Sequence, residues 1–236
     1  LSEHAEVRLP VIVCYDGFFT SHQKRRVNYF KDRKVVQDFV GEPPAGFANI
    51  IDPQHPITVG AHMNGDDLTN NHYQNSEALY KAADVFKEIA KEYAALSGRE
   101  YPIMELYRME DAEVALFLLN SAAETSKDAV DKLRGQGIKA GLISPNMLRP
   151  FPTEAIREAL RNVKAVVVGD RADSYGSDGG NMAHEVKSAL KSDPMNKTVV
   201  ISRIYGLGGK DFYPEDAEEL LRLAVKAVQN PSEVKG

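Results

Sequence analysis

The sequence is poor in cysteine and has no long hydrophobic run. Its 236 residues include one cysteine, Cys14, so an internal disulfide is excluded, and a single thiol cannot by itself hold an iron–sulfur cluster. No apolar stretch approaches the roughly 20 residues that a helix needs to cross a bilayer, so we expect no contact with a membrane. Both absences favour a protein of the cytoplasm.

The chain also lacks an excess of positive charge. It carries 29 Lys and Arg against 34 Asp and Glu, a formal net charge of −5, and no basic run, which argues against nucleic acid as a partner. With 43% hydrophobic and 27% charged residues, the composition is ordinary for a globular protein. Its length suffices for one large domain or two ordinary ones.

The N-terminus predicts a buried strand at an unusual place. The chain starts at Leu1 without Met and without a signal-peptide pattern. The apolar run "LPVIVC" at 9–14 predicts a central, parallel strand that ends at Tyr15, and such a strand needs neighbours on both faces. We therefore expect that residues are missing upstream and that the chain is a piece of something larger.

Residues 20–75 have little periodicity. They are rich in turn residues, and so long a segment of this kind is unusual inside a compact domain. We predict that it wraps a partner or crosses between domains, and that the chain assembles into an oligomer. An amphipathic helix is predicted next, over 76–96, with Val85, Ile89 and Leu96 among its regularly spaced apolar residues.

From about Leu106 the pattern changes to regular alternation of strands and helices. Strands are predicted at 114–119, 138–144, 163–169 and 198–203, and helices at 121–134, 152–160, 181–190 and from Tyr213 onward. This alternation predicts an α/β fold, a mainly parallel sheet with helices on both faces. We therefore divide the chain into residues 1–105, with the wrapping segment and its helix, and a complete α/β domain at 106–236.

The end of the first predicted strand carries the main candidate site. In open parallel sheets, ligands bind beyond the carboxyl ends of the strands. The stretch "YDGFFTSHQ" at 15–23 places Asp16, Thr20 and His22 at such an end, where they are candidates for contact with a cofactor pocket or a subunit interface. The pattern assigns them no catalytic role, and a simple turn at Gly17 is the alternative.

Two glycine-rich stretches invite a phosphate-binding interpretation. "GLGGKD" at 206–211 fails the P-loop pattern because Ile204 replaces a required glycine and Asp211 replaces the hydroxyl residue that binds Mg²⁺. A tight turn with positive φ angles is favoured instead. "YGSDGGN" at 175–181 could offer backbone N–H groups to an anion, but Asp178 would oppose it; a loop that seats a neighbouring domain is the alternative.

The histidines do not predict a metal site. His55, His62 and His72, with Asp66 and Asp67 nearby, lie seven and ten residues apart and lack the short spacing of metal ligands. Structural or interface histidines are favoured. There is also no Ser-His-Asp arrangement and no pair of carboxylates on one helix face, so we predict no catalytic and no metal-binding residues within this chain.

Several stretches together resemble the α-type subunit of pyruvate:ferredoxin oxidoreductases, in its C-terminal part. The resemblance covers nearly the whole chain in order. It is carried by "YDGFFTSHQ" at 15–23, "DPQHP" at 52–56, "YAALSGREY" at 93–101, "DAEVALFLLNSAAETSKDAVDKLRGQGIKAGLISPNMLRPFP" at 111–152 and "RIYGLGGKDF" at 203–212.

The resemblance implies an oxidoreductase of anaerobic metabolism. Members of that family oxidatively decarboxylate a 2-oxoacid such as pyruvate with coenzyme A and reduce ferredoxin, using thiamine diphosphate, Mg²⁺ and iron–sulfur clusters. The first residues here would be the end of the domain that binds the cofactor's pyrimidine. Residues 106–236 would be similar to the C-terminal domain of transketolases.

The same resemblance implies that this chain alone is inactive and binds no cofactor. The glutamate that activates thiamine would lie upstream, and the diphosphate, Mg²⁺ and cluster sites would belong to other domains or subunits, which are the expected partners. Phe19 stands where an arginine is expected, which leaves the 2-oxoacid open. The alternatives are another 2-oxoacid, a transketolase-like component, or a non-catalytic ligand-binding or assembly module.

Overall fold

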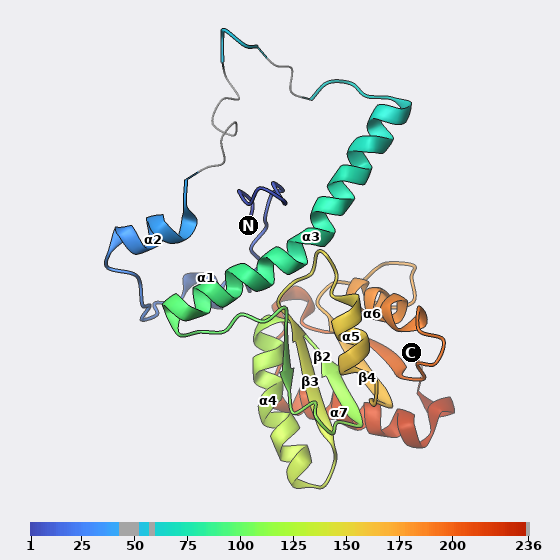
Figure 1. Cartoon of the computed structure of the whole chain (residues 1–236). Helices are drawn as coiled ribbons and strands as arrows, with labels where there is room; N and C mark the ends of the chain where they lie inside the picture. The colour runs from blue at the N-terminus through green and yellow to red at the C-terminus, as the bar shows by residue number, and fades with distance from the viewer. Residues whose placement is uncertain (43–51, 57–59, 235–236) are drawn as a thin grey trace. The chain divides into compact units, whose positions relative to one another are not determined.

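The computed structural model describes residues 1–42, 52–56 and 60–234. The chain divides into two compact units, Leu1–Pro102 and Ile103–Gly236 (Figure 1). Each unit is described by itself below. That the first unit is the end of a pyrimidine-binding domain stays a prediction.

The second unit is built on one five-stranded sheet. The strands lie in the order β1-β3-β2-β4-β5, and all neighbouring pairs are parallel except β1 with β3. The predicted mainly parallel sheet is therefore confirmed. The strands are β1 (Met104–Tyr107), β2 (Val114–Phe117), β3 (Ala140–Pro145), β4 (Ala165–Asp170) and β5 (Val199–Ile204).

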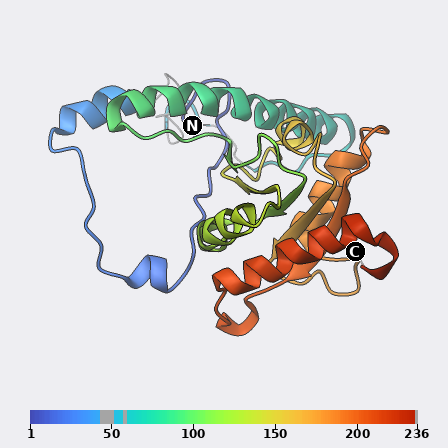
Figure 2. The same cartoon turned by 90° about the horizontal axis from the view of Figure 1, so that it is seen from below.

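Helices cover both faces of this sheet, as predicted (Figure 2). Successive residues of a strand point to opposite faces, so Leu116 packs with α4 and α7 while Phe117 packs with α5 and α6. The central strands are apolar at Val114–Phe117 of β2 and Ala165–Val168 of β4, because neither face meets water there. The helices are α4 (Asn120–Gly135), α5 (Thr153–Ala159), α6 (Asn181–Lys191) and α7 (Pro214–Gln229).

The connections reverse direction between β2 and β4. The chain leaves β2 through α4 to β3 on one side, and then passes through α5 to β4 on the other side. The carboxyl ends of β2 and β4 are thus neighbours from which the chain departs to opposite faces. In α/β sheets this is the position where ligands usually bind.

The edge strand β1 was not predicted from the sequence. It pairs antiparallel with β3, and Leu106 at its centre is half exposed because the strand lies at the edge of the sheet. Four residues, MELY, are too short a run to distinguish such a strand from a loop.

The predicted strand at 9–15 is not formed. These residues have no regular structure, and Ile12 and Val13 are 85% and 80% exposed. The physical reason is that a parallel strand needs hydrogen-bonding neighbours, and the described part of the first unit contains no strand that could pair with it. Cys14, expected inside the strand, is exposed.

Helix α3 (Gly65–Ser97) begins eleven residues before the predicted start at 76. Its first turns are exposed and mostly polar, with Leu68 the one aliphatic side chain in 65–75, so a helical period of apolar residues is absent there. Segment 20–75 is therefore less irregular than predicted, since it also contains α2 (Arg33–Val40) and most of α1 (Phe19–His22). Part of that segment, 43–51 and 57–59, lies outside the described residues.

The first unit has a small core. Val7, Ala82 and Val85 are buried among its described residues, and the ring of Tyr93 packs against aromatic side chains, with the Phe39 ring 5.6 Å away between centroids and the Tyr101 ring 5.4 Å away. Among the described residues of both units, no helix is long and apolar enough to cross a membrane.

Candidate functional site

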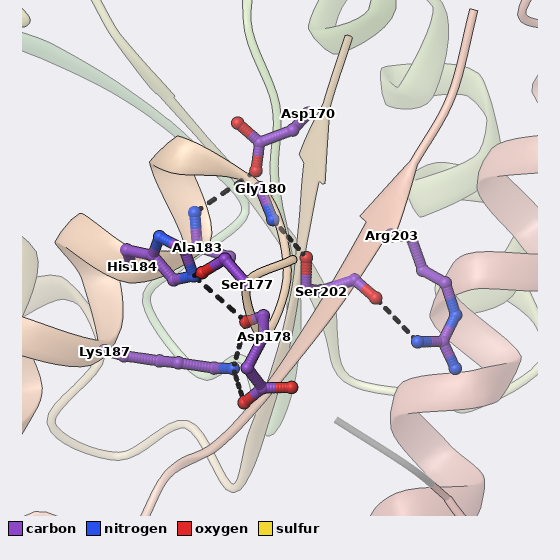
Figure 3. Close-up of polar contacts among 9 residues, drawn as sticks. All are labelled: Asp170, Ser177, Asp178, Gly180, Ala183, His184, Lys187, Ser202 and Arg203. Carbon is purple, nitrogen blue, oxygen red and sulfur yellow. Dashed lines mark hydrogen bonds and ion pairs between the residues drawn. The ribbon is translucent and has the colours of Figure 1, made fainter. Parts of the chain in front are cut away.

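The candidate site lies at the carboxyl ends of β4 and β5, where the loop 171–180 leads into α6 (Figure 3). Gly169, near the end of β4, is required here by close packing. A Cβ at this position would lie 2.3 Å from Cδ2 of Leu118 and 3.1 Å from the ring of Tyr205. The ends of the neighbouring segments therefore meet without space for a side chain.

Asp170, the last residue of β4, caps the N-terminus of α6 with its side chain. Its carboxylate accepts backbone N–H groups from Met182 at 2.8 Å and Ala183 at 3.2 Å. The start of a helix carries unpaired N–H groups and a partial positive charge, which a carboxylate neutralises. Gly180 permits this approach, since a Cβ there would lie 2.3 Å from the Asp170 carboxyl group.

This contact bears on the anion interpretation of "YGSDGGN" at 175–181. The N–H groups of Met182 and Ala183, at the start of α6, are engaged by the chain's own carboxylate, so they are not available to a bound anion. These two N–H groups therefore give no support to the anion interpretation. The other interpretation, a loop that seats a neighbouring domain, stays a prediction; Tyr175 in the loop is 91% exposed.

Ser202 of β5 ties the same loop to the sheet. Its hydroxyl is buried and accepts the N–H of Gly180 at 3.0 Å. Gly179 adopts a φ of +104°, which few side chains tolerate, and a Cβ there would lie 2.5 Å from the Ser202 hydroxyl. The glycines at 179 and 180 therefore allow the backbone to lie directly on β5.

A surface network holds the tip of the loop against α6. His184 Nε2 lies 3.0 Å from the Ser177 hydroxyl and 3.1 Å from the Asp178 carbonyl, and Lys187 Nζ donates to the Asp178 carboxylate at 3.0 Å (Figure 3). This hydrogen bond and the charge of Lys187 lower the pKa of Asp178. The network pins the loop to the helix.

Ser177 and His184 do not form an activated nucleophile. A histidine that acts as a general base needs an unprotonated ring nitrogen that can accept the serine hydroxyl proton. His184 Nε2, the nitrogen next to Ser177, also lies beside the carbonyl of Asp178. That carbonyl favours the tautomer with the proton on Nε2. His184 is half-buried in the first turns of α6.

The glycine-rich stretch after β5 is a turn, as predicted. Gly206, Gly208 and Gly209 have φ angles of 64°, 65° and 81°. Tyr205 before the turn packs on Phe212 after it, with ring centroids 4.9 Å apart. The backbone conformation and this aromatic pair account for the sequence of the stretch.

The candidates at the N-terminal stretch lie in the first unit. His22 ends α1, stacks on Phe18 with centroids 5.4 Å apart, and shares a 2.7 Å hydrogen bond with the Ser21 hydroxyl through Nδ1. Asp16 and Thr20 are half-buried, while His22 is exposed. Their contact with a cofactor pocket or a subunit interface stays a prediction.

The histidines weighed for a metal are placed singly in the structure. His55 Nδ1 lies 2.8 Å from the carboxylate of Asp52, and this hydrogen bond is the main cause that lowers the pKa of Asp52. In the ranges that the structure describes, no three His, Cys, Asp or Glu side chains gather as a metal site would require.

Asp170 and Ser202 were missed by the sequence analysis. Their partners lie twelve and twenty-two residues away along the chain, so no local spacing connects them. A carboxylate at the carboxyl end of an apolar strand was the one available signal, and it marks many residues that have no such contact.

Fold and site together define a class: a two-unit chain whose second unit is an α/β sheet covered on both faces, with side chains at the ends of β4 and β5 bonded to the chain's own loop and helix. Two family models match the sequence. "Pyruvate flavodoxin/ferredoxin oxidoreductase, thiamine diP-bdg" matches residues 1–94, and "Pyruvate:ferredoxin oxidoreductase core domain II" matches residues 112–217. The chain belongs to the pyruvate:ferredoxin oxidoreductase family.

Curated relatives agree with this assignment. The chain is 40% identical over 225 residues to a pyruvate synthase subunit PorA of Thermotoga maritima, covering 95% of this chain and 56% of that protein. It is 32% identical over 222 residues to the PorA subunit of Methanothermobacter thermautotrophicus, covering 94% and 56%. The chain thus spans about half the length of the curated relatives that it matches.

A relative named for a different substrate has a similar sequence identity to this chain. The alpha subunit of an NADH-dependent phenylglyoxylate dehydrogenase of Aromatoleum evansii is 35% identical over 219 residues, covering 89% of this chain and 52% of that protein. Among solved structures, a 2-oxoglutarate:ferredoxin oxidoreductase from Magnetococcus marinus matches with a TM-score of 0.45 and 15% identity, covering 70% of this chain and 24% of that one.

Proposed function

We propose that the chain is part of the alpha subunit of an enzyme that converts pyruvate, coenzyme A and oxidised ferredoxin to acetyl-CoA, CO₂ and reduced ferredoxin, or runs the reverse reaction. The 40% identity over 225 residues to a pyruvate synthase subunit carries this proposal. The reaction releases two electrons for each pyruvate, and ferredoxin takes them up.

The residues of this chain support an assembly role rather than the chemical step. At the carboxyl ends of β4 and β5, Ser202 and Asp170 are engaged in internal contacts with the loop and with the start of α6. The single cysteine cannot hold a cluster, and the described residues form no acidic or histidine group that fits Mg²⁺. Thiamine diphosphate, Mg²⁺ and the clusters are therefore proposed for other parts of the enzyme.

The first unit is the part of this chain proposed to meet the cofactor-binding region. Its model match is to a thiamine diphosphate-binding domain, and Asp16, Thr20 and His22 lie at its N-terminal stretch. Partners are the remaining subunits, with ferredoxin acting through the complex, and the proposed setting is the cytoplasm. Thr20 and Asp16, which are half-buried, are the candidates to position against that region.

A second candidate differs in the 2-oxoacid. The 35% identity to a phenylglyoxylate dehydrogenase subunit is close to the identities of several pyruvate synthase subunits, so overall similarity does not separate an aliphatic from an aromatic substrate. Phe19, which stands where an arginine is expected, bears on the identity of the 2-oxoacid. This argument comes from the sequence alone, because the structure does not describe the Phe19 side chain.

The test is an assay of the complete complex that contains this chain. Coenzyme A-dependent reduction of ferredoxin or viologen is measured with pyruvate, 2-oxoglutarate and phenylglyoxylate in parallel. We expect the highest kcat/KM with pyruvate. A clear preference for phenylglyoxylate would establish the second candidate, and absence of reduction with pyruvate would overturn the proposal.

A further inference from the structure

The first unit carries a concentrated positive charge between α1 and α2. Residues 24–34, which we call the basic segment, contain six Lys and Arg against one Asp, a net charge of +5. The whole chain has a net charge of −5, so its remaining residues carry −10. The six cations form two short groups on either side of 27–30: Lys24, Arg25, Arg26, Lys31, Arg33 and Lys34.

The charge of the basic segment is mostly uncompensated. All six cationic side chains are exposed. Lys34 pairs with Asp38 at 2.7 Å, and Arg25 donates to the neutral side chain of Gln23. The other four have no carboxylate partner in the part of the chain that the structure describes, and Asp32 is engaged as the N-cap of α2. The basic segment therefore attracts a surface of negative charge.

Exposed apolar side chains accompany this charge. Val27 and Tyr29 are 73% and 78% exposed between the two groups of cations. Arg and Tyr are among the residue types that most often dominate the energy of a protein interface. The segment is also fixed in place, because the Phe30 ring meets the Tyr93 ring of α3 edge to face, with centroids 6.3 Å apart.

The first half of α3 has the opposite charge. Over 65–80 it contains three carboxylates and no Lys or Arg, and the positive end of the helix offsets only about half a charge. One face of this half, which we call the acidic face, carries residues at seven-, four- and three-residue spacing: Asp66, Tyr73, Glu77 and Tyr80. Its two tyrosines are 64% and 69% exposed. The acidic face thus matches the basic segment in charge and in apolar content.

This half of α3 also lacks support from the described part of its own chain. Every residue from 65 to 77 is exposed, and the buried residues of the helix begin at Ala82. A helical stretch of about 13 residues is marginal in water without tertiary contacts. A partner that covers the acidic face would therefore stabilise it.

The two surfaces lie far apart in one chain. The basic segment is fixed next to Tyr93, whereas Tyr73 lies twenty residues earlier, which is about 30 Å along the helix. A two-fold axis that sets two α3 helices antiparallel brings each basic segment to the acidic face of the other copy. The contact then forms twice, as in the closed two-fold dimers that are the commonest oligomers.

We propose that the basic segment docks on the acidic face of α3 in a second copy of this chain. Complementary charge orients the two copies, and the exposed tyrosines and Val27 add apolar contact. The charge of −10 on the remaining residues repels the phosphates of nucleic acids and membranes, whereas it gives a second copy the sign that the basic segment attracts. The proposal does not depend on the function proposed above.

The test is sedimentation velocity of the full chain at low and at high NaCl concentration. We expect a dimer whose dissociation constant rises by about ten-fold or more between about 50 and about 500 mM NaCl, because salt screens exposed charges. Association through the exposed apolar stretch 11–15 would not weaken in salt. A dimer that salt does not weaken, or a monomer at both salt concentrations, would overturn the proposal.

Charge reversal locates the contact on the basic segment. Arg25→Glu with Arg26→Glu should weaken association by about ten-fold or more, because two attractive charges become repulsive. The matched control is Lys197→Glu with Lys210→Glu, which changes the net charge equally at two exposed residues of the second unit and should leave the dissociation constant unchanged. Equal effects of the two pairs of changes would overturn the proposal.

Charge exchange identifies the partner surface. Asp66→Arg with Glu77→Arg should weaken association, and the addition of Arg25→Glu and Arg26→Glu should restore it, since the contact then forms with its signs reversed. If circular dichroism shows that Asp66→Arg unwinds the start of α3, the exchange is made at Glu77 alone. Failure of the combined variant to associate would overturn the proposal, as would salt-sensitive binding of duplex DNA by a chain that stays monomeric.

Discussion

The carboxylate of Asp170 lies 2.8 Å from the backbone nitrogen of Met182 and so connects the end of β4 to the start of α6. One side chain thereby joins the two ends of the eleven-residue stretch between Asp170 and Met182. The contact explains why the loop between them has a defined path, and why its glycines lie directly against the sheet.

Replacing Asp170 should therefore cost stability. Asp170→Ala removes the acceptor for the Met182 and Ala183 N–H groups, and loss of a helix cap lowers the free energy of unfolding by about 1–2 kcal/mol. Asp170→Asn, which keeps an oxygen acceptor but not the charge, should lose less. Urea unfolding of the two variants checks this order, and an unchanged midpoint for Asp170→Ala would contradict it.

A methyl group at Gly169 should also destabilise the second unit. The added Cβ would lie 2.3 Å from Leu118 Cδ2, and relieving such a clash in a packed core costs about 1–3 kcal/mol. Gly135→Ala is the control: it ends α4 with no atom within 4 Å of the added Cβ, and should be neutral or stabilising by up to about 1 kcal/mol. Equal effects of the two changes would show that the close packing at Gly169 is wrong.

The pairing at Glu113 should be visible in its titration. Lys164, which donates a hydrogen bond, and Lys139, which lies farther away, both lower the pKa of Glu113, the first more than the second. Because the folded-state pKa is lowered, the pairing stabilises the folded chain at neutral pH, and its contribution is lost as the pH falls through that pKa.

Carboxyl ¹³C NMR on two variants separates these effects. Lys164→Met should raise the pKa of Glu113 toward its ordinary value by more than Lys139→Met does, since it removes the closer partner. The reverse order would mean that the two lysines exchange roles in solution.

Hydrogen exchange should distinguish the stretch 11–15 from the sheet. Its apolar side chains, including Ile12 and Val13, are exposed, and it lies in no ladder among the described residues, so its amides should exchange rapidly in the isolated chain. In the assembled enzyme we expect strong protection, while β4 should be protected in both. Slow exchange of the 11–15 amides in the isolated chain would contradict this prediction, because it would show that another segment of the same chain pairs with the stretch.

The second unit was largely predictable because its signals are local. The runs around Leu116 and Val167 are apolar throughout, as strands covered on both faces must be, and they alternate with helices of ordinary length. The edge strand β1 was not predictable, since a half-exposed strand of four residues has no such run. The strand at 9–15 was predicted from the same apolar signal and is wrong here, since strands depend on neighbours.

The candidate site was less predictable than the fold. The positive φ angles of the turn at 206–209 were expected because glycine alone tolerates them without strain. The contact of Asp170 with Met182 was not expected, since a helix cap normally comes from the residue just before the helix. Asp178, judged from sequence as a charge opposing an anion, is paired with Lys187 on α6 instead.

The sequence by itself determined the order of strands and helices from β2 onward and the family to which the chain belongs, because both are carried by residues close together along the chain. Only the tertiary structure decided that Asp170 caps α6, that Ser202 holds the loop, and that Glu113 pairs with Lys164. These relationships join residues far apart in sequence, and they exist only once the sheet has brought the strand ends together.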